Sequence, residues 1–315
     1  MRKKTFFGCS LDGDSAFEVV CRTIQKRELY LAGETGQLTK YNKSCYKNTE
    51  TRIKMNGKIS KPLQEFRGVG QGKIRSSDHY KNYINPVLET LEAADLGVQI
   101  GPINTGISCV ADDLYLDTDD EVKLQGLIDI AQHYGYQYRV EYGASKTVIG
   151  SKHDMKLYED IQPWLMNDTP VSVKENNDHL GLIVSGIREE DKNVDQKLKK
   201  AKGSLFSLLG PVFSSKCLLS PAVQLHLFRI FTCPIARSGL AAMTLRSNHI
   251  NPLTSFHKKT IRGFLHLSDK APVPSLYFLT GELPFEAKLH RDVFSLFYNI
   301  WINPNTKIFS IICYL

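Results

Sequence analysis

The sequence lacks a long apolar run and an export signal. No segment approaches the roughly 18 consecutive apolar residues that a membrane-spanning helix needs. The N-terminal Met1-Arg2-Lys3-Lys4 is basic, but the apolar segment after it is short and Asp12 follows almost at once. That pattern is typical of a strand entering a core rather than of a signal peptide. We therefore expect an intracellular protein, nuclear or cytoplasmic, with no membrane partner.

The sequence also lacks a zinc motif. None of its 7 cysteines stands in a Cys-x-x-Cys pair or in a Cys/His spacing that suits zinc. The odd count and the missing export signal favour a reducing compartment. The cysteines are Cys9, Cys21, Cys45, Cys109, Cys217, Cys233 and Cys313.

Charge is distributed unevenly along the 315 residues. Residues 1–75 hold 16 Lys+Arg against 7 Asp+Glu, residues 76–185 hold 7 against 18, and residues 186–315 hold 17 against 8. The three blocks therefore carry net charges of +9, −11 and +9, which sum to the +7 of the whole chain. Basic flanks around an acidic centre fit a protein that holds a polyanion and gathers carboxylates around cations. Ordinary variation of a protein surface would produce the same numbers.

The first third of the chain begins with a strand. The apolar run at 5–11 predicts a buried strand that ends at Asp12, and Asp14 or Ser15 could cap the helix that follows. That helix would turn its apolar side chains to the core (Ala16, Phe17, Val19, Val20 and Ile24). The polar stretch from Lys26 to Pro62 predicts a helix and then a hairpin turning at Asn56-Gly57.

The middle third shows clear periodicity. Apolar residues between Tyr80 and Leu91 recur at helical spacing after Ser77 or Asp78, and residues 121–134 repeat the pattern. Between these helices, residues 107–116 predict a β-hairpin with Ala111-Asp112-Asp113 at its tip. Strands around 138–142 and 147–149 follow. This order predicts an α+β fold, a split β-α-β antiparallel sheet with helices on one face. After Gly186 the chain turns basic and helical, with breaks at Gly210-Pro211 and Ser220-Pro221.

Three carboxylates stand where metal-assisted phosphoryl transfer would need them. Two Mg²⁺ ions in such a site lie about 3.5–4 Å apart and are held by carboxylates. Asp12 at a strand end and Asp112-Asp113 at a hairpin tip supply that arrangement. Taken singly, an Asp-Asp pair is more often a solvated turn.

Several segments, in order, resemble the palm and thumb of the reverse transcriptases of non-LTR (LINE-type) retrotransposons. SLDGDSAFEVV resembles the first palm motif, FRGVGQG the second, VADD the aromatic-Ala-Asp-Asp motif, YGASKT the Lys-bearing motif and HLG the primer-grip hairpin. Residues 261–290 resemble the thumb. The resemblance spans roughly residues 5–307 and implies a palm over 1–186 and a mostly helical thumb over 187–315.

The resemblance implies a role for each matching residue. Asp12, Asp112 and Asp113 would hold two Mg²⁺ ions, and Lys146 would protonate or neutralise the departing pyrophosphate, unless it is simply solvated. Phe17 would act as a steric gate for deoxynucleotides, or it is an ordinary core residue. The predicted nucleotide contacts are Gln71 and Gly72, with a plain glycine turn as the alternative, and the predicted primer grip is Leu180 and Gly181.

Two basic clusters could follow nucleic-acid phosphates. Either could equally be a solvated helix face. The predicted phosphate contacts are Lys197, Lys199, Lys200, Lys202, Lys258, Lys259 and Arg262.

The match departs from the family pattern at several positions. These are Val110 before Ala111, Glu18, Gly70, Ser77 and Ala144-Ser145. None removes a predicted metal ligand. Only eleven residues precede Asp12, so we expect the fingers to be largely absent and primer extension by this chain to be weak or undetectable.

The sequence therefore predicts an RNA-directed DNA polymerase with an RNA template, a DNA primer and deoxynucleoside triphosphates as partners. The alternative is an inactive remnant that keeps the palm fold and binds nucleic acid. An unrelated Mg²⁺ enzyme would leave the second motif and the thumb segment unexplained.

Overall fold

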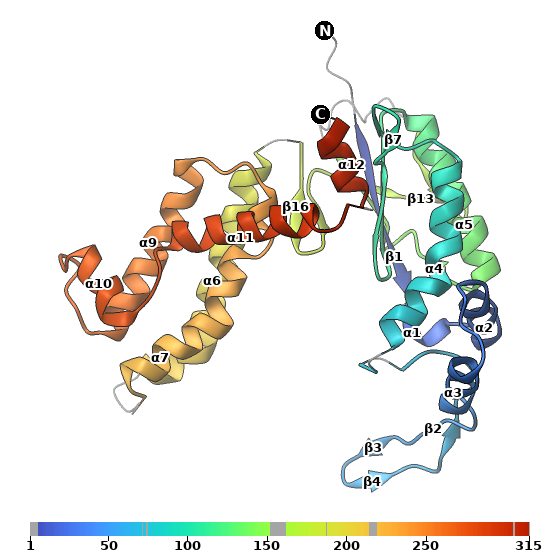
Figure 1. Ribbon diagram of the computed structural model, residues 1–315, viewed down its shortest axis with the longest axis horizontal. Helices are drawn as coiled ribbons and strands as arrows, with labels where there is room; N and C mark the ends of the chain where they lie inside the picture. Colours follow the sequence, from blue (N-terminus) through green and yellow to red (C-terminus); the bar gives the residue numbers. More distant parts are fainter. Residues whose placement is uncertain are drawn as a thin grey trace. The chain divides into compact units, whose positions relative to one another are not determined.

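The computed structural model describes residues 6–70, 72–73, 75–151, 162–186, 188–213, 219–304 and 306–314. The chain divides into two compact units, unit 1 (Met1–His179) and unit 2 (Leu180–Leu315). The division falls a few residues before the predicted boundary at residue 186. Figure 1 traces the elements of both units, and each unit has its own buried core.

Unit 1 is built on a sheet centred on β1 (Phe7–Asp14). The order is β14 (Ser172–Lys174), β11 (Val148–Ser151), β1, β9 (Asp113–Thr118) and β8 (Ile107–Val110), and β10 (Glu141–Tyr142) pairs with the end of β1. The pairs of β1 with β11 and β9, and of β9 with β8, are antiparallel, whereas β11 and β14 are parallel. The prediction of an α+β fold is confirmed, but the prediction of a purely antiparallel sheet is wrong at this edge. The connection between β11 and β14 is long enough for the crossover that a parallel pair requires.

One face of the sheet carries the core of unit 1. Cys9 and Leu11 on β1 and Leu116 on β9 are fully buried, while the residues between them on each strand point to the other face. Helices α4 (Ser76–Ala93) and α5 (Glu121–Tyr138) pack against each other and against the sheet (Figure 1). Both helices were predicted. The side chain of Asp120 caps α5 by accepting hydrogen bonds from the backbone N–H groups of its first turn.

The helix predicted after Asp14 is in fact two helices. α1 (Ala16–Val19) ends at Val20, and α2 (Arg22–Leu31) starts after Cys21. Ser15 has a φ of +51° and its side chain makes no capping hydrogen bond, so the predicted cap is wrong for Ser15. Tertiary hydrogen bonds account for the break. The carbonyl of Val20 accepts from Gly68 N, and Cys21 N donates to the Tyr83 hydroxyl.

A two-stranded arm projects from unit 1 after α3 (Gln37–Cys45), as Figure 1 shows. Its outer ladder pairs β3 (Lys54–Met55) with β4 (Lys58–Ile59), and its inner ladder pairs β2 (Glu50–Thr51) with β5 (Leu63–Gln64). Asn56 and Gly57 at the tip both have positive φ, the geometry of a type I′ turn. The predicted hairpin at Asn56-Gly57 is confirmed. We call residues 50–64 the arm.

The other elements of unit 1 are short. They are β6 (Gln99–Ile100), β7 (Ile103–Asn104), β12 (Leu165–Met166), β13 (Thr169–Pro170) and β15 (Asn177–His179).

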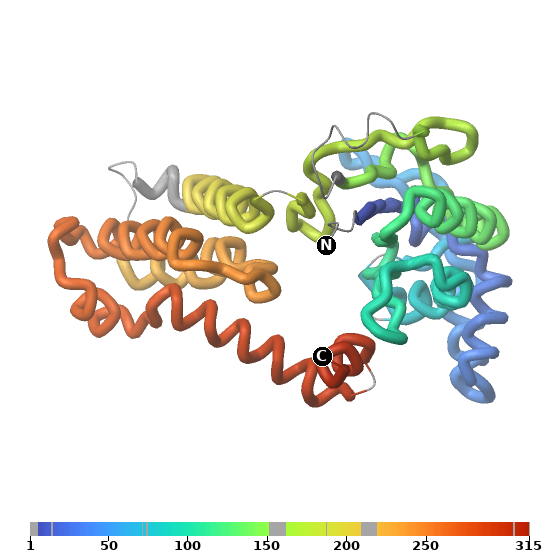
Figure 2. Tube along the Cα trace, turned by 90° about the horizontal axis from the view of Figure 1, so that it is seen from above, coloured from blue at the N-terminus to red at the C-terminus, as the bar shows by residue number. Residues whose placement is uncertain are grey.

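Unit 2 is mostly helical. Its longest helix, α6 (Glu189–Phe213), packs against α8 (Cys233–Arg237) and α9 (Ser247–Phe264), and α9 in turn contacts α10 (Val273–Thr280) and α11 (Phe285–Trp301). Figure 2 shows the helices of unit 2 in yellow to red. The break predicted at Gly210-Pro211 is wrong, because α6 continues to Phe213, whereas Ser220 does cap α7 as the Ser-Pro pattern suggested. The elements are β16 (Leu182–Val184), α6 (Glu189–Phe213), α7 (Pro221–Leu227), a π-helix (Phe228–Thr232), α8 (Cys233–Arg237), a 3-10 turn (Leu240–Ala242), α9 (Ser247–Phe264), α10 (Val273–Thr280), α11 (Phe285–Trp301) and α12 (Lys307–Tyr314).

No helix among the described residues is both long enough and apolar enough to cross a membrane.

A buried ionic cluster lies in the core of unit 2. The Glu282 carboxylate is 2% exposed and accepts hydrogen bonds from Lys288 and Arg229, with His257 Nε2 3.8 Å away. Burial alone would raise the pKa of Glu282, but its interactions with His257, Lys288 and Arg229 outweigh burial and lower the pKa to about 2. Burial lowers the pKa of His257. Both pKa shifts favour the states present at neutral pH, an ionised Glu282 and an uncharged His257.

Unit 2 should therefore lose stability in acid. Glu282 has a depressed pKa in the fold, so its contribution is complete above its unfolded pKa and disappears as the pH falls toward 2. The complete loss should be on the order of 3 kcal/mol in the free energy of unfolding, of which roughly 2 kcal/mol should appear by pH 3. Protonation of His257 in the unfolded chain acts in the same direction.

Urea unfolding at pH 7 and pH 3 measures the effect, and exposed Glu286→Gln serves as the control, which should keep the acid dependence. Glu282→Gln should be less stable at pH 7 and lose part of that dependence; an unchanged profile would contradict this account.

Candidate functional site

Asp12 and Asp113 face each other across the middle of the sheet. The register of β1 and β9 pairs Asp12 directly with Asp113, and Leu11 with Leu114. The two leucines are buried in the core. Because side chains alternate along a strand, the two carboxylates lie on the opposite face, with Cβ atoms about 5 Å apart. The fold thus brings together two residues that are about a hundred positions apart in the sequence.

Asp112 lies at the tip of the hairpin that β8 and β9 form, as the sequence predicted. Val110 pairs with Asp113, so Ala111 and Asp112 make a two-residue turn. Ala111 has a φ of +57°, a left-handed conformation that costs an alanine about 1 kcal/mol. Its carbonyl accepts a hydrogen bond from Cys109 Sγ at 3.3 Å. The strained turn places Asp112 directly beside the Asp12–Asp113 pair.

The three carboxylates lie in one electrostatic environment. Burial raises the pKa of Asp113, the charges of Asp112 and Asp12 raise it further, and His179 acts against them. Burial, followed by Asp112 and Asp113, also raises the pKa of the Cys109 thiol to about 11. Like charges gathered this closely repel one another, and a cation among them would relieve that repulsion.

The donor set fits a divalent cation in chemistry. Carboxylate oxygens are the ligands that Mg²⁺ prefers. In the described part of the chain, no three His, Cys, Asp or Glu side chains already converge on one point as metal ligands would. The Asp12 side chain is 46% exposed, so it is free to rotate toward the hairpin tip. Rotation of such exposed carboxylates is what would bring the three around a cation.

Lys146 lies next to Asp12. Its Nζ is 3.8 Å from Asp12 Oδ2. β10 and β11 both pair with β1, so the turn between them, which carries Lys146, returns to the end of β1. Both side chains are about half exposed, and an ion pair of this kind contributes less than about 1 kcal/mol. Lys146 is therefore held near the carboxylates without being locked to one of them.

Phe17 belongs to the same neighbourhood. Its ring stacks on Tyr80 at 4.9 Å, and the charge of Asp112 reaches the buried Tyr80 hydroxyl. Val69 N donates to the Phe17 carbonyl at 2.8 Å, which joins the first and second motifs. Gln71 lies outside the described residues. Gly72 is exposed and has a φ of +77°.

The sequence analysis missed three side chains around the carboxylates. His179 acts on Asp113, and its ring packs on Tyr115 at 4.8 Å. Asp112 contributes, after burial, to raising the pKa values of Tyr80 and Tyr142. A sequence signal existed for His179, because it stands in the HLG motif.

The predicted primer-grip residues begin unit 2. Leu180 and Gly181 have φ values of +50° and +74°, a two-residue turn. Lys197 Nζ donates to the Gly181 carbonyl at 2.9 Å. Lys197 is only 4% exposed, and burial lowers its pKa. Lys197 therefore supports this turn, instead of being the solvent-facing phosphate contact that the helix pattern predicted.

The other predicted phosphate contacts differ in accessibility. Lys199, Lys200 and Lys202 on α6 are exposed, and so is Lys259 on α9. Lys258 and Arg262 are half-buried, and Arg262 donates to the Ala271 carbonyl at 2.8 Å. Phosphate binding by the exposed lysines stays a prediction, whereas Arg262 also has a structural contact.

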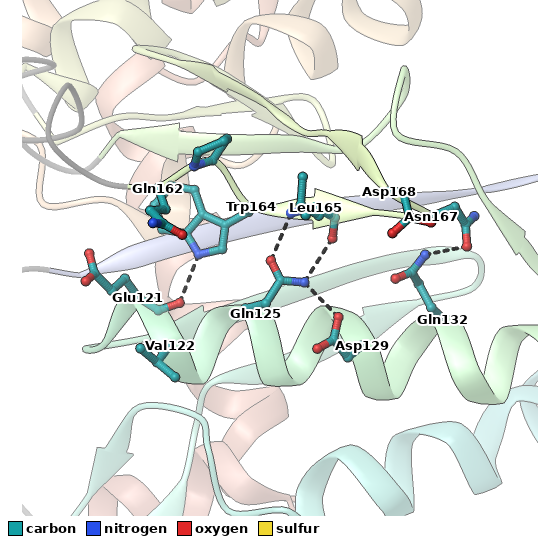
Figure 3. A pocket seen from close by; sticks show the side chains of 11 residues that line it. Glu121, Val122, Gln125, Asp129, Gln132, Gln162, Trp164, Leu165, Asn167 and Asp168 are labelled. Atoms are coloured by element: carbon teal, nitrogen blue, oxygen red, sulfur yellow. Dashed lines mark hydrogen bonds between the residues drawn. The ribbon is translucent and has the colours of Figure 1, made fainter.

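A cavity of about 720 Å³ lies elsewhere in unit 1, between α5 and the β12–β13 hairpin. Figure 3 shows how its polar groups are used. Gln125 exchanges two hydrogen bonds with the backbone of Leu165, and Trp164 Nε1 donates to the Glu121 carbonyl. Gln132 bonds to the Asn167 side chain. These contacts attach the hairpin to the helix, so we place the chemistry at the carboxylates and not here.

Comparison with known proteins gives distant structural matches only. No protein-family model matches the chain, and no curated protein matches it. Among solved structures, apo telomerase from Candida tropicalis matches with a TM-score of 0.40 and 10% identity, covering 88% of this chain and 53% of that chain. Telomerase from Candida albicans, in complex with a fragment of telomeric RNA, matches with a TM-score of 0.34 and 13% identity, covering 86% and 46%. The chain spans about half the length of these telomerase chains.

Proposed function

We propose that this chain is the catalytic part of an RNA-directed DNA polymerase of the non-LTR retrotransposon type. The observation that carries the proposal is the strand register that pairs Asp12 with Asp113 beside Asp112. The order of the sequence motifs supports the choice of polymerase class. The reaction would add a deoxynucleotide to a primer 3′-hydroxyl, directed by an RNA template.

Each residue has a distinct part in this proposal. Asp12, Asp112 and Asp113 would hold two Mg²⁺ ions, and bound cations would supply the Lewis acidity on which phosphoryl transfer depends. Lys146, which lies beside Asp12, would neutralise or protonate the departing pyrophosphate. Phe17, stacked on Tyr80, would border the sugar of the incoming nucleotide.

Primer extension tests the proposal. The intact chain is given a poly(rA) template, an oligo(dT) primer and dTTP, with Mg²⁺ or with EDTA. We expect weak extension that requires the cation. Extension that continues undiminished in EDTA would contradict a carboxylate–metal mechanism.

A second candidate is a nucleic-acid-binding protein without catalysis. It is favoured by one observation, namely that the three carboxylates do not already converge as metal ligands within the described residues. The two candidates differ in one result. Binding of the primer–template by a chain that extends no primer at any Mg²⁺ concentration would select the second.

Phe17→Val should relax sugar selection. Loss of the ring opens space beside the nucleotide, so the ratio of ribonucleotide to deoxynucleotide incorporation should rise about tenfold or more. Single-nucleotide extension with rUTP and dTTP measures it, with Phe17→Tyr as the control that keeps the ring. If Phe17 serves only the core, both substrates would slow together and the melting temperature would fall.

A further inference from the structure

The arm is exposed along its whole length. Each residue from Glu50 to Gln64 is exposed, on both faces of both ladders. An isolated two-stranded hairpin is at best marginally stable in water, so an arm of this kind needs a firm base or a partner.

The base of the arm is firmly held by Arg22 on α2. Its guanidinium donates to Thr49 Oγ1 at 2.8 Å and to the Glu65 carbonyl at 2.7 Å, so it contacts both ends of the arm. It also donates to the Gly68 carbonyl at 2.9 Å. Arg22 is itself buried. The arm is thus rooted beside the segment that contacts Phe17 in the candidate site.

The charge of the arm indicates that its partner is a polyanion. The arm carries four basic residues (Arg52, Lys54, Lys58 and Lys61) against Glu50 alone, a net charge of +3. Among the described residues, none of the four forms an ion pair with an acidic side chain. Cross-strand pairing puts Lys54 beside Ile59 and Lys58 beside Met55, so both faces of the tip present a cation. A polyanion on either face would find a matching charge.

The composition of the arm favours a duplex over unpaired bases. Residues 50–64 contain no aromatic side chain, and stacking on aromatic rings is what holds single-stranded bases. Lysines on a two-stranded ribbon suit the phosphates of paired strands.

We infer that the arm binds the sugar–phosphate backbone of a nucleic-acid duplex through Arg52, Lys54, Lys58 and Lys61. The inference rests on the nucleic-acid partner of the proposed function and adds a binding site to it. Because the arm is rooted at the candidate site, the bound duplex would lie next to that site.

Duplex binding by the full-length chain tests the inference without requiring catalysis. The triple variant Lys54→Gln, Lys58→Gln, Lys61→Gln is compared with a matched control, Lys26→Gln, Lys81→Gln, Lys174→Gln, which removes three exposed lysines of unit 1 outside the arm. Fluorescence anisotropy is recorded with a labelled RNA–DNA duplex and with a single strand, at several salt concentrations. Circular dichroism melting checks that each variant folds.

We expect the arm variant to bind the duplex about tenfold more weakly, and its slope of log affinity against log salt to fall by about 2–3. The control should change much less, and the single strand should be affected less than the duplex. Equal losses in the two variants, or an unchanged arm variant, would overturn the inference while leaving the proposed function standing. If arm-dependent binding is found for phosphatidylserine vesicles and not for the duplex, the arm serves a membrane surface and the inference is also overturned. A complete lack of nucleic-acid binding by the intact chain would remove the proposed function as well.

Discussion

Replacing Asp113 with asparagine should lower the rate of primer extension about a thousandfold. Asparagine keeps the shape of the side chain but removes the charge that a metal ligand needs. Asp113 is paired directly with Asp12 and adjoins Asp112. No other residue of β9 stands opposite Asp12, so no other side chain of that strand can replace it. Asp12→Asn should cause a loss of the same size, because the two residues share one site.

The comparison needs a control that changes charge but not the site. Asp129→Asn on α5 is exposed, bonds to Gln125 and lies by the separate cavity. It should extend primers at the rate of the unmodified chain. If Asp113→Asn extends primers as fast as Asp129→Asn, the carboxylates are not the catalytic centre.

Gly106→Ala should destabilise unit 1 by about 3 kcal/mol or more. A Cβ atom at this position would lie 2.1 Å from the Asp117 carbonyl oxygen and 2.4 Å from Val98 N. Both are backbone atoms in a hydrogen-bonded crossing, where Asp117 N donates to the Gly106 carbonyl. The strands must therefore separate just ahead of the hairpin that carries Asp112 and Asp113.

Urea unfolding monitored by circular dichroism measures this change. Gly203→Ala is the control, because its Cβ on helix α6 would meet nothing within 4 Å. That substitution should stabilise the helix by about 0.5–1 kcal/mol. Equal effects of the two alanines would show that the close backbone contacts at Gly106 do not affect the free energy of unfolding.

The parts of the fold that could be predicted are those with a strong local signal. α4 and α5 follow from apolar residues at helical spacing, and the tip of the arm follows from Asn56-Gly57. The β8–β9 hairpin follows from two apolar runs around Ala111-Asp112-Asp113. In each case propensity and hydrophobic pattern agree, and the packing in the fold agrees with them.

The features that could not be predicted depend on contacts between distant residues. The break between α1 and α2 exists because Gly68 and Tyr83 bond to the backbone of Val20 and Cys21. The parallel edge strand β14 depends on where the chain returns after β11. Lys197 has the sequence pattern of an exposed helical lysine, yet it is buried against the turn at Gly181. No local window of sequence contains the partner in any of these cases.

The candidate site shows the same division. The order of motifs pointed to Asp12, Asp112 and Asp113, and the register of β1 and β9 gives two of them a common face of the sheet. The side chains that surround the carboxylates could not be predicted from the sequence. The proximity of His179 to Asp113 and of Tyr80 to Asp112 comes from tertiary packing, and no spacing in the sequence encodes it.

Cation binding tests the central claim most directly, because the claim is that residues from two distant motifs form one metal centre. The full-length chain is titrated with Mn²⁺, and bound ion is followed by electron paramagnetic resonance. Bound Mn²⁺ should be displaced by Mg²⁺ and should be lost or much weakened in both Asp12→Asn and Asp113→Asn, but not in Asp129→Asn. Mn²⁺ binding that survives unchanged in both site variants, or that is absent from the intact chain, would contradict the account.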